Sequence, residues 1–274
     1  MEIIITIFLF LFGIVIGSFL NVCIVRWPHE KSVVRPRSHC PKCAKVIRWY
    51  DNIPLLSYLI LGGKCRHCKT KISFRYFLVE LISGLSFVLF YYFFGLDVLL
   101  VPYLFMMGCF IIATFVDFEH RIIPDEVSVG GMCVGLVMSL LIPSMHVLNV
   151  GDLPWYLLHL KSFGISLLGV IIGGGCIYLM GMLGDWMFKK ESMGGGDIKF
   201  LAMVGAFLGW EKALLAFFIA PFFGAVYGII EKIRVDDTAI AYGPFLVLGS
   251  LIALFYGDPI IAWIIGGYGI RSSF

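Results

Sequence analysis

Long apolar runs constrain this chain more than any other feature of its sequence. Seven runs reach the roughly 20 residues that a helix needs to cross a bilayer, and an eighth, 200–210, is apolar but short. The chain is 60% hydrophobic and only 14% charged, which excludes a soluble domain of this size. The sequence therefore predicts an all-α polytopic membrane protein with about eight transmembrane helices. The seven longer runs are 3–25, 76–94, 98–116, 127–147, 162–186, 213–230 and 240–256.

The first run is predicted to be a true membrane span rather than a cleavable signal peptide. Glu2 stands where a signal peptide has its basic residues, and the apolar stretch is longer than a signal peptide requires.

Positive charge predicts the orientation of these spans. The segment 26–75 holds 12 of the 21 Lys and Arg residues, against only Glu30 and Asp51 as acids, so the positive-inside rule places it in the cytoplasm. Eight spans then put the N-terminus outside the cytoplasm and the loops at 117–126, 187–199 and 231–239 inside it. A basic loop beside a membrane more often contacts anionic lipid headgroups than nucleic acid. We therefore expect lipid headgroups, and no nucleic acid, as its partners.

Four of the eight cysteines form a pattern in this basic segment. Cys40 and Cys43 stand in "CPKC", and Cys65 and Cys68 stand in "CRHC", with 21 residues between the two motifs. Two C-x-x-C turns at such a spacing supply four thiolates for a tetrahedral zinc ion. The alternative is a redox dithiol or free thiols, although a reducing cytoplasm disfavours structural disulfides. The sequence thus predicts a small zinc-binding loop domain, in which His67 is a bystander.

Two aspartates are predicted to lie at one membrane depth. Asp117 ends an apolar run, and Asp197 closes "GGGD" just before the short run; the predicted topology puts both at the cytoplasmic side. Two carboxylates a few Å apart cannot both ionise easily, so one can act as base on water while the other polarises a carbonyl. Gly194 and Gly196 leave room for a substrate backbone beside Asp197. This pattern predicts an aspartic protease.

Each aspartate also has a simpler interpretation. Asp117 can be an ordinary interfacial residue, and Asp197 can cap the helix that follows it. Lys199 can pair with a carboxylate or with lipid headgroups. Other acids lie in or near spans without a glycine turn or an evident partner, among them Glu80.

Five blocks of sequence, in order, resemble one family. They are "GSFLNV" at 17–22, the cysteine segment at 37–76, "VDFEHRIIPDEVS" at 116–128, "GGGDIKFLAMVGAFLGW" at 194–210 and "YGPFLVLGSLIAL" at 242–254. Together they resemble the type IV prepilin peptidases, membrane aspartic proteases of the G-x-G-D type in bacteria. A departure is Phe77, where many members have proline.

The resemblance implies a bifunctional enzyme of the bacterial inner membrane. It implies cleavage of the leader of type IV prepilins or type II secretion pseudopilins, followed by N-methylation of the new N-terminus with S-adenosylmethionine. The catalytic aspartates of the family fall on Asp117 and Asp197, not on Asp125, and its four metal cysteines fall on those of the two C-x-x-C turns. No motif in the sequence reveals where S-adenosylmethionine binds.

The domain organisation expected from these observations has three parts. Residues 1–25 form the first transmembrane helix, residues 26–75 the cytoplasmic zinc-binding domain linked to methylation, and residues 76–274 the membrane-embedded peptidase. Two alternatives remain open: an intramembrane aspartic protease of the presenilin type without methylation, or a non-enzymatic, zinc-containing membrane scaffold of a secretion system.

Overall fold

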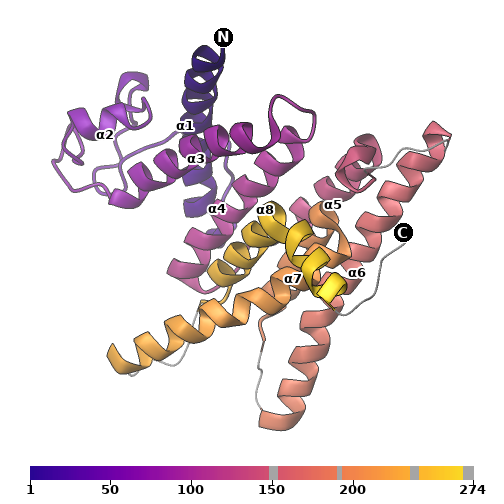
Figure 1. The fold of residues 1–274 in the computed structure, drawn as a ribbon. Coiled ribbons are helices and arrows are strands. Elements are labelled where there is room, and N and C mark those ends of the chain that lie inside the picture. Colours follow the sequence, from indigo (N-terminus) through magenta and orange to yellow (C-terminus); the bar gives the residue numbers. More distant parts are fainter. Residues whose placement is uncertain (148–153, 190–192, 235–240, 268–274) are drawn as a thin grey trace. The chain divides into compact units, whose positions relative to one another are not determined.

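The computed structural model describes residues 1–147, 154–189, 193–234 and 241–267 of the chain, and it is helical throughout these ranges apart from loops and two isolated β-bridges (Figure 1). The longer helices are α1 (Glu2–Arg26), α3 (Phe74–Phe94), α4 (Leu100–His120), α5 (Asp125–Leu141), α6 (Trp155–Phe188), α7 (Gly195–Arg234) and α8 (Gly243–Gly267). The short elements are α2 (Leu56–Ile60) and the 3-10 turns η1 (Trp27–His29), η2 (Trp49–Asp51) and η3 (Pro143–Met145).

Six helices in the described ranges are long and apolar enough to cross a membrane, namely α1, α3, α4, α6, α7 and α8. The sequence led us to expect about eight spans, and two features account for the difference. Helix α5 has only 17 residues, which is the lower end of the range of about 17–25 residues for a membrane-spanning helix. The runs 200–210 and 213–230 are joined in the 40-residue helix α7, which is interrupted at Gly209. Most of the predicted loop 231–239 lies outside the described residues.

The chain divides into two compact units, Met1–Phe115 and Val116–Phe274. The division falls inside α4, so Asp117 belongs to the second unit. Asp197 and the start of α8 belong to the second unit as well, whereas all four cysteines of the C-x-x-C turns belong to the first.

The first unit is built on the pairing of α1 with α3. Gly17 approaches α3 so closely that an added Cβ would lie 2.7 Å from the Cα of Glu80, and Gly13, one turn earlier, is equally crowded. The Ser83 hydroxyl donates to the Gly13 carbonyl at 2.7 Å, and Asn21 Nδ2 donates to a backbone carbonyl of α3 at 3.0 Å. Small residues four apart allow membrane helices to pack in this way. The block "GSFLNV" therefore serves helix pairing.

A buried carboxylate ties the loop between α1 and α3 to the helix pair. Glu80 is only 8% exposed, and its Oε2 accepts a hydrogen bond from the backbone N–H of Leu55 at 2.7 Å. Leu55 has a positive φ of 59° directly before α2. The expectation that Glu80 has no partner was wrong, because its partner is a backbone group that sequence patterns do not reveal.

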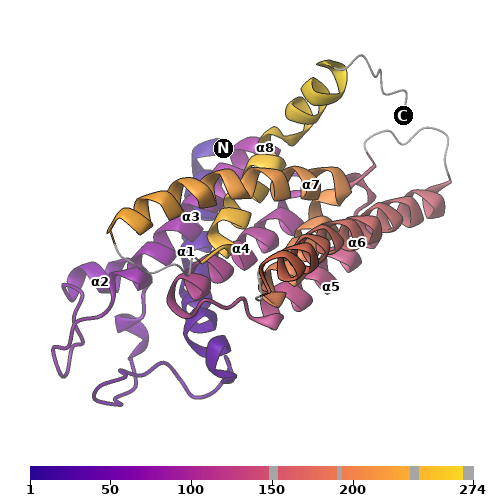
Figure 2. The same cartoon turned by 90° about the horizontal axis from the view of Figure 1, so that it is seen from below.

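In the second unit, α6 and α7 run side by side at backbone distance (Figure 2). Gly169 and Gly205 are so close that a Cβ on either would collide with the carbonyl of the other. One turn further, a Cβ on Gly173 would lie 2.6 Å from the carbonyl oxygen of Leu201. These contacts fix the early part of α7 against α6.

Helix α7 is broken at Gly209, whose φ of 79° and ψ of 172° are accessible almost only to glycine. The break turns the next N–H away from the carbonyl of Ala206, its regular helical acceptor. Two side chains satisfy that carbonyl instead: Ser166 Oγ donates at 2.7 Å and His146 Nε2 lies at 3.2 Å.

Replacing Gly209 with alanine is expected to destabilise the protein, because alanine cannot adopt this backbone conformation without strain of about 1–3 kcal/mol. Equilibrium unfolding in mixed micelles would measure the loss. Gly130→Ala is the matched control, since Gly130 is inside α5 and an added Cβ meets nothing within 4 Å. If Gly209→Ala were as stable as Gly130→Ala, the break in α7 would not depend on glycine.

Candidate active site and metal centre

The four cysteines of the loop come together as the sequence predicted. The Sγ atoms of the four cysteines all lie within 4.8 Å of one another. These cysteines are Cys40, Cys43, Cys65 and Cys68. Cys40 Sγ and Cys68 Sγ are 3.7 Å apart, which is close to the roughly 3.8 Å expected between two ligands of a tetrahedral site with Zn–S bonds of about 2.3 Å. This pair therefore has the spacing of two ligands of a tetrahedral site, and all four sulfurs are close enough together to share one ion.

The two cysteine pairs are held by the same backbone turn, which we call the first knuckle (40–45) and the second knuckle (65–70). In the first, the N–H of Ala44 donates to the carbonyl of Cys40 at 2.9 Å, and in the second, the N–H of Lys69 donates to that of Cys65 at 3.0 Å. Ala44 and Lys69 have φ values of 54° and 58°. Each knuckle therefore turns its two thiols toward one point.

Two of the four thiols, those of Cys40 and Cys68, ionise more easily than an ordinary cysteine, and this favours a cation between the sulfurs. Hydrogen bonding with Thr70 lowers the pKa of Cys68 to about 6, and backbone N–H groups, first that of Cys43, lower the pKa of Cys40. The backbone N–H of Lys45 lowers the pKa of Cys43, but desolvation and the neighbouring thiols outweigh it and raise that pKa to about 11. Four sulfurs so close can all be thiolates only around a cation. The cluster fits a metal ion such as zinc.

Asp117 and Asp197 come together in the second unit although 80 residues separate them in the sequence. Their carboxylates interact electrostatically. Asp117 is near the end of α4 and only 5% exposed, and Asp197 lies half-buried in the first turn of α7. Two helix ends therefore bring one carboxylate each to the same place.

The backbone of α8 holds the carboxylate of Asp117. The first residue of α8, Gly243, donates its N–H to Asp117 Oδ2 at 2.8 Å. A Cβ on Gly243 would lie only 2.8 Å from the same oxygen, so this approach requires glycine. Arg121, whose N–H donates to the carbonyl of Asp117 at 2.9 Å, adds a positive charge near the carboxylate. Asp117 is thereby fixed in position by its surroundings.

The glycines of "GGGD" differ in what surrounds them. A Cβ on Gly194 would lie 3.3 Å from Asp197 Oδ2, and a Cβ on Gly196 would lie 3.3 Å from the Cβ of Ile123. Gly195 alone of the three has open space in place of a Cβ. Gly196 therefore allows close packing against the segment before α5, and Gly195 is the position with room for another backbone.

Lys199 lies outside the aspartate pair. Its Nζ forms an ion pair with Asp125, at 2.7 Å from Oδ1 and 2.9 Å from Oδ2. This pair joins the first turn of α7 to the first residue of α5 and is largely exposed. Its position agrees with the assignment of Asp117, rather than Asp125, to the pair with Asp197.

Two residues near the pair were not singled out in the sequence, Tyr242 and Gly243. Tyr242 interacts electrostatically with Asp197, and its buried hydroxyl has no hydrogen-bond partner among the described residues. Both residues belong to the block "YGPFLVLGSLIAL", which carried the family resemblance but no predicted role. Only the fold brings them within reach of the aspartates.

Comparison with known proteins gives matches over nearly the whole chain. Residues 11–94 match the bacterial peptidase A24 N-terminal domain, and residues 104–229 match the type IV leader peptidase family. A prepilin leader peptidase/N-methyltransferase of Myxococcus xanthus is 39% identical over 82% of this chain and 62% of its own length. Proteins of the same name from Legionella pneumophila, 32% identical over 93% of each chain, and Pseudomonas aeruginosa, 34% identical over 91% and 90%, are also similar. No solved structure is significantly similar to this chain.

The six apolar helices and these relatives define a multi-pass protein of the bacterial inner membrane. The chain belongs to the type IV leader peptidase family.

Proposed function

We propose that this protein cleaves the leader peptide from type IV prepilins or type II secretion pseudopilins and methylates the N-terminus that cleavage exposes. The proximity of Asp117 and Asp197 within one unit is the observation that carries the proposal. The names of the relatives support this function over a presenilin-type protease without methylation and over a non-enzymatic scaffold.

In the proposed cleavage, one aspartate takes a proton from water as the water attacks the scissile carbonyl carbon. The other aspartate, protonated, donates a hydrogen bond to the carbonyl oxygen as negative charge develops there. Collapse of the tetrahedral species breaks the C–N bond, and a proton passes to the leaving amine. The Gly243 N–H keeps the carboxylate of Asp117 in position during these steps. Gly195, which has open space beside it, offers a close approach to the substrate backbone.

In the proposed methylation, S-adenosylmethionine supplies an electrophilic methyl group when it is bound. The chain must hold the newly formed N-terminal amine in its neutral form, because only the unprotonated nitrogen has a lone pair. We assign a structural role to zinc in the four-cysteine site, since four thiolates leave no open coordination position for a substrate. The zinc would then fold the basic loop in which the methyltransferase activity resides.

We propose a cytoplasmic location for both activities. The support is the concentration of 12 of 21 Lys and Arg residues in 26–75, and from the same rule we infer an N-terminus outside the cytoplasm. The same charge favours contact with anionic lipid headgroups rather than nucleic acid. The division into residues 1–25, 26–75 and 76–274 remains a prediction, as do Gly194, Gly196 and Lys199 as supporting residues of the peptidase site.

Mass spectrometry of a purified prepilin incubated with this protein tests the proposed function. We expect loss of the leader peptide, and an additional mass of one methyl group only when S-adenosylmethionine is present. An unchanged prepilin would contradict the peptidase, and a cleaved but unmethylated product in the presence of the donor would contradict the methyltransferase alone.

Gly243→Ala is expected to lower the cleavage rate by about 10–100-fold, because displacement of a catalytic group by a fraction of an ångström to about 1 Å can cost that much. The new Cβ would be 2.8 Å from Asp117 Oδ2 and must push the carboxylate away. Initial rates of leader removal measure the effect. Gly266→Ala, in the same helix with open space around the added Cβ, is the control. Equal rates for the two variants would show that Asp117 need not occupy this position.

A further inference from the structure

A cavity of about 780 Å³ lies in the first unit, at the end of α1 that is predicted to face the cytoplasm. Val22 and Arg26, one helical turn apart at the end of α1, form one of its walls. Residues of the segments 33–38 and 46–52 form the others. Neither the four cysteines nor the aspartate pair line the cavity, so it is separate from both sites described above.

The charged side chains that line this cavity are all positive. Arg26, Arg37 and Arg48 are among the lining residues, and no Asp or Glu is. Arg26 donates to two backbone carbonyls of the segment 32–36, at 2.8 and 2.6 Å, which holds its charge at the wall. Arg37 is exposed, and its guanidinium has no ion-pair partner among the residues that the structure describes. Guanidinium groups match the oxygens of phosphate in geometry and charge, so the cavity suits an anion of this kind.

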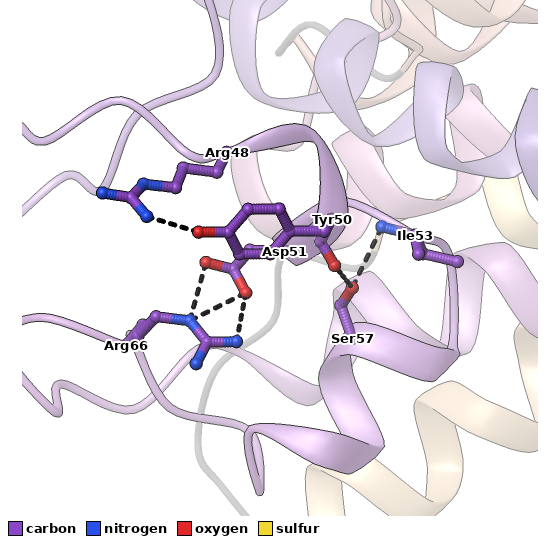
Figure 3. Close-up of polar contacts among 6 residues, drawn as sticks. All are labelled: Arg48, Tyr50, Asp51, Ile53, Ser57 and Arg66. Atoms are coloured by element: carbon purple, nitrogen blue, oxygen red, sulfur yellow. Dashed lines mark hydrogen bonds and ion pairs between the residues drawn. The ribbon is translucent and has the colours of Figure 1, made fainter.

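The one acid in the segment 46–52 does not offset this charge. Asp51 accepts hydrogen bonds on both carboxylate oxygens from Nε and a terminal nitrogen of Arg66, at 2.6–2.9 Å. Figure 3 shows Tyr50 and Asp51 between Arg66 and Arg48. Arg48 donates to the Tyr50 hydroxyl from one terminal nitrogen, which leaves its other N–H groups for a ligand. The carboxylate of Asp51 is therefore paired with the second knuckle, and the cavity stays positive.

The length of α1 places the cavity at the depth of lipid headgroups. A helix of 25 residues is about 37 Å long, which exceeds the roughly 30 Å of the hydrocarbon core. The last turn of α1 therefore lies among headgroups when the helix crosses the membrane. Trp49 and Val34 also line the cavity and are 81% and 80% exposed. Tryptophan is typical of the membrane–water interface, and an acyl chain can cover apolar groups that a free anion would leave in water.

We propose that this cavity binds the headgroup of one anionic phospholipid, with the phosphate against its three arginines and the start of an acyl chain against Trp49 and Val34. The inference rests on the cytoplasmic placement of the basic loop proposed above, and it gives the lipid contact of that loop a definite site. Phosphatidylglycerol has a negative charge and no amine, whereas phosphatidylethanolamine adds an ammonium group that the arginines repel. The site therefore selects phosphatidylglycerol.

Native mass spectrometry of the delipidated protein in neutral detergent micelles tests this site, because such micelles have no surface charge of their own. We expect one phosphatidylglycerol per chain to bind at least about tenfold more tightly than phosphatidylethanolamine, since charge-assisted hydrogen bonds hold the anion. Arg37→Gln should weaken binding of phosphatidylglycerol by about tenfold and leave the metal content unchanged.

Arg35→Gln is the matched control, since Arg35 is an exposed arginine two residues before Arg37 that does not line the cavity. It should bind phosphatidylglycerol as the wild type does. If Arg35→Gln and Arg37→Gln weakened binding equally, the loop would attract anionic lipid only through its overall charge, and the cavity would not be the site.

A second pair of variants changes the charge of the cavity without removing an arginine. Val34→Glu adds a carboxylate to the wall, and Val34→Gln adds a side chain of the same size without the charge. Because Val34 is 80% exposed, both variants should fold and keep their metal. We expect only Val34→Glu to lose phosphatidylglycerol, and equal binding by the two variants would contradict a site that is selected by charge.

Inorganic phosphate distinguishes a lipid headgroup from a free anion. Phosphate should displace phosphatidylglycerol no more than sodium chloride of equal ionic strength does, because the free ion gains nothing from the apolar part of the lining. Stronger displacement by phosphate would reassign the cavity to a soluble phosphate. A lipid that joins three segments of the chain should also raise the melting temperature of the wild type, and absence of this shift would count against the site.

The outcomes separate this inference from the proposed function, because the lipid measurements use no prepilin. If prepilin is cleaved and methylated while phosphatidylglycerol does not bind, only the lipid site fails. If the lipid binds as expected but prepilin is unchanged, only the proposed function fails. Labelling of the basic loop from outside intact spheroplasts would overturn its cytoplasmic placement, and with it the assignment of this lipid to the cytoplasmic leaflet.

Discussion

Replacing Asp117 or Asp197 with asparagine is expected to lower the rate of leader cleavage by about 10³-fold or more, because each loss removes a group that transfers or donates a proton in the rate-determining step. Asparagine keeps the shape of the side chain, and at position 117 its carbonyl oxygen can still accept the Gly243 N–H. The variants should therefore fold normally. Single-turnover cleavage of a prepilin, followed by mass, measures the rate.

The control for both substitutions is Asp185→Asn, which changes an exposed aspartate of α6 in the same unit. It should cleave at the wild-type rate. Methylation of a synthetic, already cleaved pilin by Asp117→Asn and Asp197→Asn should also be unaffected, which would confirm that the variants are intact. Cleavage at a normal rate by either variant would show that the aspartate pair is not the catalytic centre.

Replacing Cys40 or Cys68 with serine is expected to reduce the metal content from about one zinc ion per chain to almost none, because a tetrahedral structural site needs all four ligands. Structural zinc contributes about 10–16 kcal/mol to the folding of small domains, so the loop should lose its order. Methylation should then fall by more than about tenfold, while cleavage continues. Metal analysis and the two activities, measured on one preparation, check the expectation.

Cys133→Ser is the matched control for the metal site, since Cys133 is an exposed cysteine of α5 outside the cluster. It should keep both the metal and the methyltransferase activity. Full methylation by a metal-free Cys40→Ser variant would contradict a structural role for the cluster in that activity.

The sequence was sufficient to predict both groups of candidate residues, for different physical reasons. The cysteines could be grouped because each knuckle is a local turn, and the spacing of a C-x-x-C pair directly reflects its geometry. Asp117 and Asp197 could be grouped because both were predicted at the cytoplasmic ends of membrane spans. The predicted topology therefore put the two carboxylates at the same depth in the membrane. The structure brings both groups together.

Contacts made by backbone groups could not be predicted. The hydrogen bond from Gly243 to Asp117 joins residues 126 positions apart, and that from Leu55 to Glu80 starts from an amide that every residue except proline carries. The roles of the glycines also depend on what they face, which is Ile123 for Gly196 and open space for Gly195. The sequence did separate the runs 200–210 and 213–230, close to the break at Gly209. The structure has fewer candidate spans because these two runs form one helix, α7, and because α5 has only 17 residues.

The glycine contacts between α6 and α7 also prevent the two helices from sliding along each other. The two helices meet at Gly169 with Gly205 and, one turn on, at Gly173 with Leu201, so the contacts follow a fixed antiparallel register. A shift of one residue would set side chains where only bare backbone fits. Asp197 lies one turn before Leu201 on α7. The register of α7 against α6, which these backbone contacts set, therefore also determines where the carboxylate of Asp197 lies along α6.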